Sequence, residues 1–271
     1  MMRVYAVVIA SVALLTSCRR NPQERQEPPT YRKSPALEIY DGFEQPRLST
    51  AWAENRFEEG AVVMERQVVR TGRQAIAVTI HNRDKFEAGR DGNLDTERDE
   101  LREATNLESR QNVPYEFSFS MFFPADFPVV PTRLVIAQWK QFCPTETGPC
   151  SDQSPVLALR YVDGTLRITQ TIGGKQTVLY RQAGEFRNRW LDFRVRARFT
   201  PGADGHIEIW LGDKQVVEYT GVTANGEDVA GGYPKPSLFF FKMGLYRDLM
   251  AQPMTVYIDE YRKRELRNGE F

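Results

Sequence analysis

Three short segments of the sequence place charged, amide or phenol side chains at alternate positions. Since alternate residues of a β-strand lie on one face of a sheet, each segment would present its polar residues side by side. These residues are Arg98, Glu100 and Arg102 in the first segment, Gln138 and Lys140 in the second, and Lys242 and Tyr246 in the third. Cations and an amide can bind an anion, and a phenol can transfer a proton. One such face alone could be the solvated side of an antiparallel sheet.

The elements that would position these residues are strands. Alternation with a period of two recurs along most of the chain, whereas helical periodicity is scarce. Apolar and polar residues alternate over 117–123, 191–199 and 207–211. Turn signals such as Asp163-Gly164 and Gly173-Gly174 separate several of these runs. Many short strands with closely spaced turns predict an all-β protein, and we expect an antiparallel sandwich of two sheets, a β-jelly roll.

Taken in order, the three segments resemble the signature strands of the jelly-roll polysaccharide lyases, a group that includes alginate lyases, glucuronan lyases and the heparin lyase I family. Those families carry an Arg-x-Glu-Leu-Arg-like, a Gln-x-His-like and a Lys-x-Gly-x-Tyr-like strand. The matching stretches here are 98–102, 138–140 and 242–246. The resemblance covers essentially 37–265. It implies a concanavalin-like sandwich with a concave cleft, and a lyase that cuts an acidic, uronate-containing polysaccharide by β-elimination.

Elimination next to a uronate carboxylate explains why these residue types belong together. The carboxylate must be neutralised, because removal of the neighbouring C5 proton produces an enolate-like dianion. By resemblance, Gln138 with Arg98 or Arg102 would hold the carboxylate. Tyr246 would serve as acid, base or both, and Glu100 would orient the arginines.

The base is the point at which this sequence departs from the families that it resembles. Lys140 stands where they carry histidine, and a lysine with the ordinary pKa of about 10.4 is a poor base at neutral pH unless it is buried. His81 ends an upstream strand, in a place like that of a histidine in the glucuronan lyases. We therefore expect His81 or Tyr246 to be the base and Lys140 to be a cationic stabiliser. Lys242 and the aromatic Trp139 are expected to bind neighbouring sugars.

Two other functions use the same fold. A non-catalytic carbohydrate-binding module would keep Trp139 and the basic groove but would need neither Tyr246 nor His81. A laminarinase-type hydrolase would need carboxylates closely spaced on one strand, and no Glu-x-Asp-x-x-Glu-like strand is present. The sequence leaves open which polymer is cut (glucuronan, alginate or a heparan-type chain) and whether attack is internal or at a chain end.

The N-terminal segment predicts export. Arg3 precedes an apolar run that is too short to span a bilayer and has the form of a secretory signal. The run ends in Leu15-Thr16-Ser17-Cys18, which resembles the bacterial lipobox and implies a lipidated Cys18. We expect a signal peptide over 1–17, a polar, proline-rich tether over 18–36 and one domain over 37–271. The expected location is the periplasm or the cell surface, with the protein anchored to the membrane through Cys18.

Composition restricts the partners. The chain has 36 Lys plus Arg and 36 Asp plus Glu residues, so nothing favours nucleic acid as a partner, and we expect a monomer that binds an acidic polysaccharide. Cys143 and Cys150 lie in one loop, and in an exported protein such a pair predicts a disulfide. No cofactor is expected for catalysis. Glu44 and Asp259 are candidates for a structural calcium ion, since calcium prefers oxygen ligands.

Overall fold

The computed structural model describes residues 37–53, 57–84, 95–143, 154–226, 233, 236–267 and 269–270. Contacts divide the chain into two units, Met1–Pro35 and Ala36–Phe271, and every described residue belongs to the second. The predicted signal peptide and tether, with Cys18, therefore lie outside the described residues. No helix in the described part is long and apolar enough to cross a membrane.

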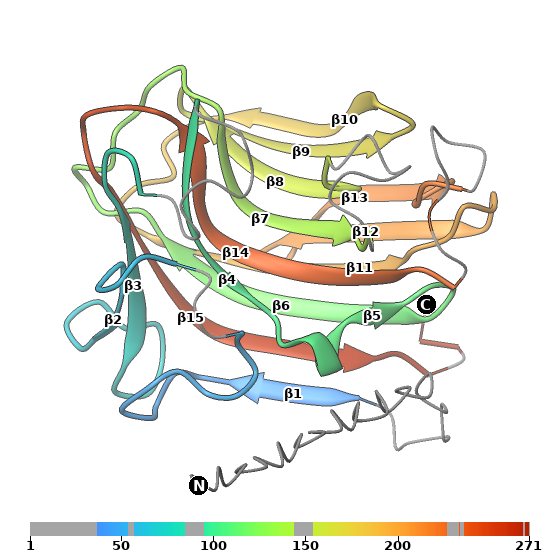
Figure 1. The fold of residues 1–271 in the computed structure, drawn as a ribbon, viewed down its shortest axis with the longest axis horizontal. Coiled ribbons are helices and arrows are strands. Elements are labelled where there is room, and N and C mark those ends of the chain that lie inside the picture. Colours follow the sequence, from blue (N-terminus) through green and yellow to red (C-terminus); the bar gives the residue numbers. More distant parts are fainter. Residues whose placement is uncertain are drawn as a thin grey trace, which may run out of the picture. The chain divides into compact units, whose positions relative to one another are not determined.

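Two antiparallel sheets form the second unit (Figure 1). The eight-stranded sheet has the order β13-β12-β11-β6-β15-β3-β2, with β1 paired to β15. Its strands are β1 (Glu38–Asp41), β2 (Val62–Glu65), β3 (Ala75–Ile80), β6 (Pro114–Phe122), β11 (Trp190–Arg198), β12 (Gly205–Leu211), β13 (Lys214–Gly221) and β15 (Met254–Glu265).

The seven-stranded sheet carries the predicted site. Its order is β10-β9-β8-β7-β14-β4, with β5 paired to β14. Its strands are β4 (Thr96–Arg102), β5 (Ser109–Arg110), β7 (Leu134–Gln141), β8 (Leu157–Val162), β9 (Thr165–Ile172), β10 (Lys175–Ala183) and β14 (Leu238–Asp248). Apart from a single 3-10 turn, Thr105–Leu107, the described elements are strands. The prediction of an all-β, two-sheet jelly roll is confirmed.

The core lies between the two sheets and follows the predicted alternation. Phe117 and Phe119 of β6 are buried, and they pack against Phe241 of β14 with ring centroids 5.5 and 5.4 Å apart. The turn residues also behave as predicted. Asp163 and Gly164 have φ angles of 50° and 67°, the left-handed conformation that a tight two-residue hairpin needs, and they join β8 to β9.

Candidate active site

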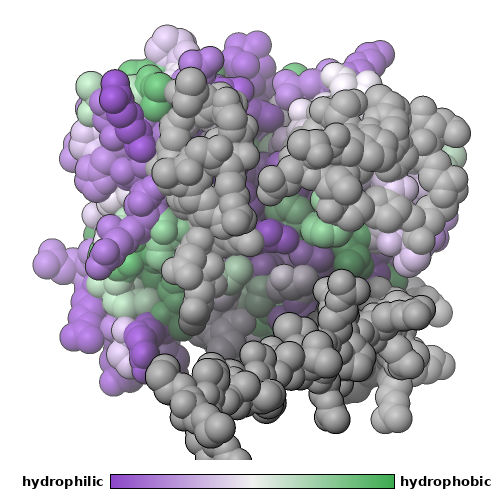
Figure 2. All heavy atoms as spheres, in the orientation of Figure 1, coloured by the Kyte–Doolittle hydropathy of each residue, from purple (hydrophilic) through white to green (hydrophobic). Residues whose placement is uncertain are grey.

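The three predicted segments lie on adjacent strands of the seven-stranded sheet. The first is on β4, the second on β7 and the third on β14, which pairs with both of the others. Lys242 lies opposite Arg102 on one side and Gln138 on the other, and Tyr246 lies opposite Arg98. The fold therefore brings these predicted residues together on the face of the sheet that points away from the core, which we call the polar face. Figure 2 shows hydrophilic residues next to hydrophobic ones in the central part of this view.

Gly244 lets β14 run very close to β4 in the middle of the polar face. Its φ is +138°, and a Cβ atom there would lie 2.4 Å from the backbone oxygen of Asp99. Only glycine tolerates both the conformation and the close approach. The pairing of β14 with β7 is irregular between Met243 and Tyr246, and Figure 1 shows both strands curving strongly along their length.

Glu100 connects β4 to the other two segments. Its side chain is 1% exposed, and its carboxylate accepts hydrogen bonds from Gln138 Nε2 and from Lys242 Nζ, the latter at 3.3 Å. Because the amide nitrogen of glutamine carries two hydrogens, Gln138 can bind Glu100 and still offer a donor to a ligand. Glu100 thus positions Gln138 and Lys242. The sequence predicted a positioning role for Glu100 toward the arginines only.

Cations surround the ring of Tyr246. The guanidinium carbon of Arg98 lies 4.5 Å from the ring centroid, and that of Arg133 lies 5.5 Å away. Arg133 also forms an ion pair with Asp248 at 2.7 Å. Burial and the charge of Arg133 lower the pKa of Arg160, and the electrostatic influence of Tyr246 opposes this shift. The phenol therefore lies where positive charge is concentrated.

The burial and the neighbouring charges of Lys140 could not be predicted from the sequence. Lys140 is partly buried on the polar face, and its ammonium group has no hydrogen bond or ion pair with the residues that the structure describes. Burial, followed by the charges of Lys242 and Arg98, lowers the pKa of Lys140 to about 7, against an opposing effect of Glu100. The objection that lysine is too basic to accept a proton at neutral pH does not hold in this position.

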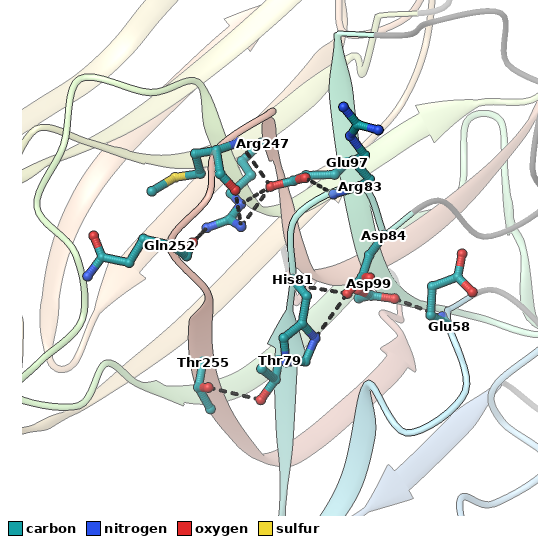
Figure 3. Close-up of polar contacts among 11 residues, drawn as sticks. Glu58, Thr79, His81, Arg83, Asp84, Glu97, Asp99, Arg247, Gln252 and Thr255 are labelled. Atoms are coloured by element: carbon teal, nitrogen blue, oxygen red, sulfur yellow. Dashed lines mark hydrogen bonds and ion pairs between the residues drawn. The ribbon is translucent and has the colours of Figure 1, made fainter.

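His81 lies at the outer edge of β4 (Figure 3). Its side chain is 61% exposed, and its Nδ1 lies 3.3 Å from Asp84 Oδ2. The backbone N–H of Arg98 donates to the carbonyl oxygen of Asp84 at 2.9 Å, while Tyr246 pairs with the other side of Arg98. Two strand spacings, roughly 10 Å, thus separate the backbones of Asp84 and Tyr246. The catalytic role predicted for His81 stays a prediction.

The substrate contact predicted for Trp139 is wrong. Its side chain is 0% exposed and packs in the core against Phe241 and Phe117, with centroid distances of 4.8 and 5.4 Å. The physical reason is strand alternation: Gln138 and Lys140 point to the polar face, so the residue between them points to the core.

Several charged residues on these strands were not predicted from the sequence. Glu97 and Arg247 form a fully buried ion pair on the core side of β4 and β14, 2.7 Å apart. Burial, with added repulsion from Asp84 and Glu58, raises the pKa of the buried Asp99 to about 8. Figure 3 shows Asp84 and Asp99 close together. Three arginines of β8, β9 and β10 were also missed, although each interrupts or follows an apolar strand pattern: Arg160, Arg167 and Arg181.

The residues proposed for calcium bind backbone N–H groups. Glu44 Oε1 accepts from the N–H of Arg73 at 2.7 Å, and Asp259 Oδ2 accepts from the N–H of Arg70 at 2.9 Å. Burial raises the pKa of Asp259 to about 6. Within the described residues, no group of three or more His, Cys, Asp or Glu side chains is arranged to hold a metal ion. The calcium site stays a prediction.

The predicted disulfide concerns Cys143 and Cys150. Cys143 follows the end of β7, whereas Cys150 lies outside the described residues. The disulfide therefore stays a prediction too.

The fold and the cation-rich polar face define a jelly-roll protein whose site suits an anionic ligand. A family model described as polysaccharide lyase matches residues 43–262, and the chain belongs to this family. It is accordingly an enzyme, a carbon–oxygen lyase that acts on polysaccharides. No curated protein sequence matches the chain significantly.

Solved structures support the fold. The chain is similar to an endo-β-1,4-glucuronan lyase of the fungus Trichoderma reesei, with 18% identity, a TM-score of 0.59 and coverage of 79% of this chain and 89% of that one. It is also similar to the cellulose-induced protein Cip1, with 13% identity, a TM-score of 0.52 and coverage of 83% and 96%. An alginate lyase of polysaccharide lyase family 7 matches with 15% identity, a TM-score of 0.48 and coverage of 71% and 79%.

Proposed function

We propose that this lyase cleaves a uronate-containing polysaccharide by β-elimination and leaves an unsaturated uronate at the new chain end. The observation that carries the proposal is the imbalance of charge beside Gln138 and Tyr246. The basic residues there are Arg98, Arg102, Lys140 and Lys242, and one buried acid, Glu100, lies among them. Part of this charge is balanced elsewhere, because Arg102 pairs with Glu108 at 3.0 Å. Basic side chains still outnumber carboxylates among the described residues of the polar face, and this composition favours a polyanion.

The first task of the site is to neutralise the substrate carboxylate. Gln138, held by Glu100, would donate its second amide hydrogen to a carboxylate oxygen. Arg98 would bind the same group from β4, next to Tyr246. These donors gain strength as the carboxylate takes up charge from C5, so they would stabilise the dianion more than the bound substrate.

The second task is proton transfer, and we assign the base to Lys140. Neutral Lys140 would accept the C5 proton on Nζ and become an ammonium. The electron pair of the C5–H bond would form the C4=C5 double bond, and the bond from C4 to the glycosidic oxygen would break. Tyr246 would donate its hydroxyl proton to that oxygen. The proton on Lys140 would then pass through solvent to the phenolate and restore both groups.

Three observations favour Lys140 over His81 as the base. Lys140 shares the polar face with Gln138, two residues along β7, whereas His81 follows a strand of the other sheet. The pKa of Lys140 is lowered to about 7, and a base works best when its pKa lies near the working pH. His81 has Asp84 as its partner, while Lys140 has none among the residues described.

The test is a panel of acidic polysaccharides, read by the ultraviolet absorbance of the unsaturated uronate. Glucuronan comes first, because a similar structure is a glucuronan lyase, and alginate, another polyuronate, comes second. We expect new absorbance with at least one unsulfated polyuronate and none with neutral glucans. Cleavage that produces reducing ends without the absorbance would mean hydrolysis and would refute the proposal.

The assignment of the base has its own test. Lys140→Arg keeps the charge but cannot lose its proton near neutrality, so turnover should fall by about 10²- to 10⁴-fold while polysaccharide binding persists. In the wild type, kcat/KM should rise with pH through about 7. Lys214→Arg, on the exposed surface of β13, is the matched control. A Lys140→Arg enzyme with wild-type turnover would leave Tyr246 or His81 as the base.

We further propose that the protein is an exported lipoprotein anchored through Cys18, which is supported by the lipobox-like Leu15-Thr16-Ser17-Cys18. Several acyl chains anchor a protein stably, whereas one binds only marginally. Cys18→Ser should therefore move the protein from the membrane fraction to the soluble one or leave it unprocessed. A wild-type protein that is cleaved elsewhere and is entirely soluble would contradict the anchor.

A further inference from the structure

Three arginines of the seven-stranded sheet lie in one row with Tyr246. Backbone pairing places Arg181 of β10 opposite Arg167 of β9, and Arg167 opposite Arg160 of β8. Arg160 lies opposite Val135 of β7, and Val135 lies opposite Tyr246 of β14. These strands are consecutive neighbours in the sheet. The row therefore runs from Tyr246 to the edge strand.

The row faces the same side as the candidate active site. The residues that flank Arg160 and Arg167 along their strands are buried in the core: Leu159, Tyr161, Leu166 and Ile168. Since successive side chains of a strand point to opposite faces, Arg160 and Arg167 point to the polar face. A bulge in β10 pairs Tyr180 with Ile168 and Arg181 with Arg167, which gives Arg181 the same direction.

Such a row is unfavourable for the protein alone. Like charges directly opposite each other on neighbouring strands are destabilising, and here two such pairs follow one another. Arg160 Nε donates to Thr169 Oγ1 at 3.0 Å, and Arg167 Nε is buried without a hydrogen-bond partner. None of the three arginines forms an ion pair with a described residue.

Arginines on the outer face of the other sheet are treated differently. Arg196 and Arg264 both bind the carboxylate of Glu116, which lies between them on β6, at 2.7 and 2.9 Å. There the protein supplies the anion. On the polar face no described residue does so for the row, which indicates that an external anion fills this role.

The spacing of the row is compatible with a polyuronate. Neighbouring strands lie about 4.8 Å apart, a distance comparable with the length of one sugar residue in a polysaccharide. A guanidinium binds a carboxylate through two parallel hydrogen bonds. A chain with a carboxylate on every sugar offers more anionic groups to the row than a chain in which neutral sugars alternate with uronates.

We propose that Arg160, Arg167 and Arg181 bind the carboxylates of successive uronate residues on one side of the cleaved bond, so that the preferred substrate is a polymer of uninterrupted uronates. The inference rests on the proposed function, since it takes Tyr246 as the place of cleavage. It adds a set of binding positions and the direction in which the chain leaves the site.

The test uses the full-length protein and uronate oligomers of increasing length. Arg160→Gln, Arg167→Gln and Arg181→Gln are compared with Arg262→Gln, a control on the exposed face of β15. We expect kcat/KM to fall by about three- to fivefold for each lost contact. Arg181→Gln should affect only the longest oligomers, Arg167→Gln those of intermediate length as well, and Arg160→Gln almost all. The dependence of binding on salt should weaken in the triple variant.

Binding of the same oligomers is measured by calorimetry alongside turnover. If each arginine variant loses the same kcat/KM at every oligomer length, or behaves like Arg262→Gln, the proposed binding positions are wrong. The proposed lyase activity of the wild type would not be affected by that result. If the wild type forms no unsaturated product, the proposed function fails, and the row then stands only if oligomer binding shows the same order of length dependence. Thermal unfolding checks the folding of each variant, and removal of like charge should keep or raise the Tm.

Discussion

The paired strands β4 and β14 carry ionic groups on both faces, and the two faces differ in how completely these groups are matched. On the core side, Glu97 and Arg247 are both 0% exposed, and Arg247 also donates to the carbonyl oxygens of Gln252 and Met250. On the polar side, Glu100 accepts a hydrogen bond from Lys242 Nζ, and several other basic side chains lie nearby. On the core side, the protein supplies a partner for each charged group. On the polar side, basic residues outnumber carboxylates among the described residues.

This difference separates structure from function on the same two strands. A fully buried charge must be paired and hydrogen-bonded because its desolvation is costly, which is what the core side provides. On the polar side, basic side chains outnumber carboxylates among the described residues, so an anionic ligand can add to the pairing. A change on the core side should therefore affect stability, and a change on the polar side should affect turnover.

The largest effect is expected from Tyr246→Phe on the polar side. The substitution removes one hydroxyl and keeps the ring between Arg98 and Arg133. If the hydroxyl protonates the leaving oxygen, turnover should fall by about 10²- to 10⁴-fold while the Tm stays near that of the wild type. Steady-state kinetics and thermal unfolding on the same preparation check both parts. A variant with full activity would show that the site lies elsewhere.

Next in size is Glu97→Ala on the core side. It leaves the guanidinium of Arg247 buried without its counter-ion, so unfolding should become easier by about 3–5 kcal/mol. Denaturant titration measures the loss. The double variant Glu97→Leu with Arg247→Met should recover most of it, because apolar residues of similar size often replace a buried ion pair without cost. If Glu97→Ala is as stable as the wild type, the ion pair between Glu97 and Arg247 does not stabilise the fold.

Gln138→Ala should have a somewhat smaller effect, confined to the polar side. Loss of one donor to the developing dianion costs on the order of 10²- to 10³-fold in kcat, and KM should change much less. Gln182→Ala on β10 of the same sheet is a control for the loss of an amide. If KM rises and kcat is unchanged, Gln138 contributes only to ground-state binding.

The smallest effect concerns the pH dependence of stability. The pKa of Asp99 is raised to about 8 by burial and neighbouring carboxylates, so the folded protein holds a proton that the unfolded chain releases from about pH 4 upward. Stability from this group is present at low pH and is lost as the pH rises through 8. The Tm of the wild type should thus fall more than that of Asp99→Asn between pH 6 and 9, by about 3 °C for each kcal/mol. If the Tm of the two proteins changes with pH in the same way, the pKa of Asp99 is not raised.

The sequence allowed the fold and the shared polar face to be predicted, because both follow from the period-two pattern. Phe117, Phe119 and Trp139 show the limit of that reasoning. Alternation predicts correctly that Phe117 and Phe119 of β6 face the core. The same alternation places Trp139 of β7 in the core, because its neighbours Gln138 and Lys140 point to the polar face, so an aromatic ring alone does not predict a sugar contact. The correct assignment was available from the same pattern.

The surroundings of Lys140 and the arginine row depend on which strands become neighbours in the sheet. The local sequence pattern does not predict strand order. The environment of Lys140 comes from charges on β4 and β14, which are distant in the sequence. The row formed by Arg160, Arg167 and Arg181 needs the pairing register of β8, β9 and β10, including a bulge in β10. Bulges shift register by one residue, so the sequence alone does not predict which side chains meet.

Gly244 sets a limit on how the third signature segment can change. A single added methyl group would lie 2.4 Å from the backbone oxygen of Asp99 and 2.9 Å from the Cα of Glu100, at a φ of +138°. The obstacle is backbone, which cannot rotate away as a side chain can. Any replacement would therefore have to move β4, and with it Arg98, Glu100 and Arg102 together. In a saturation scan of β14, position 244 should accept glycine alone.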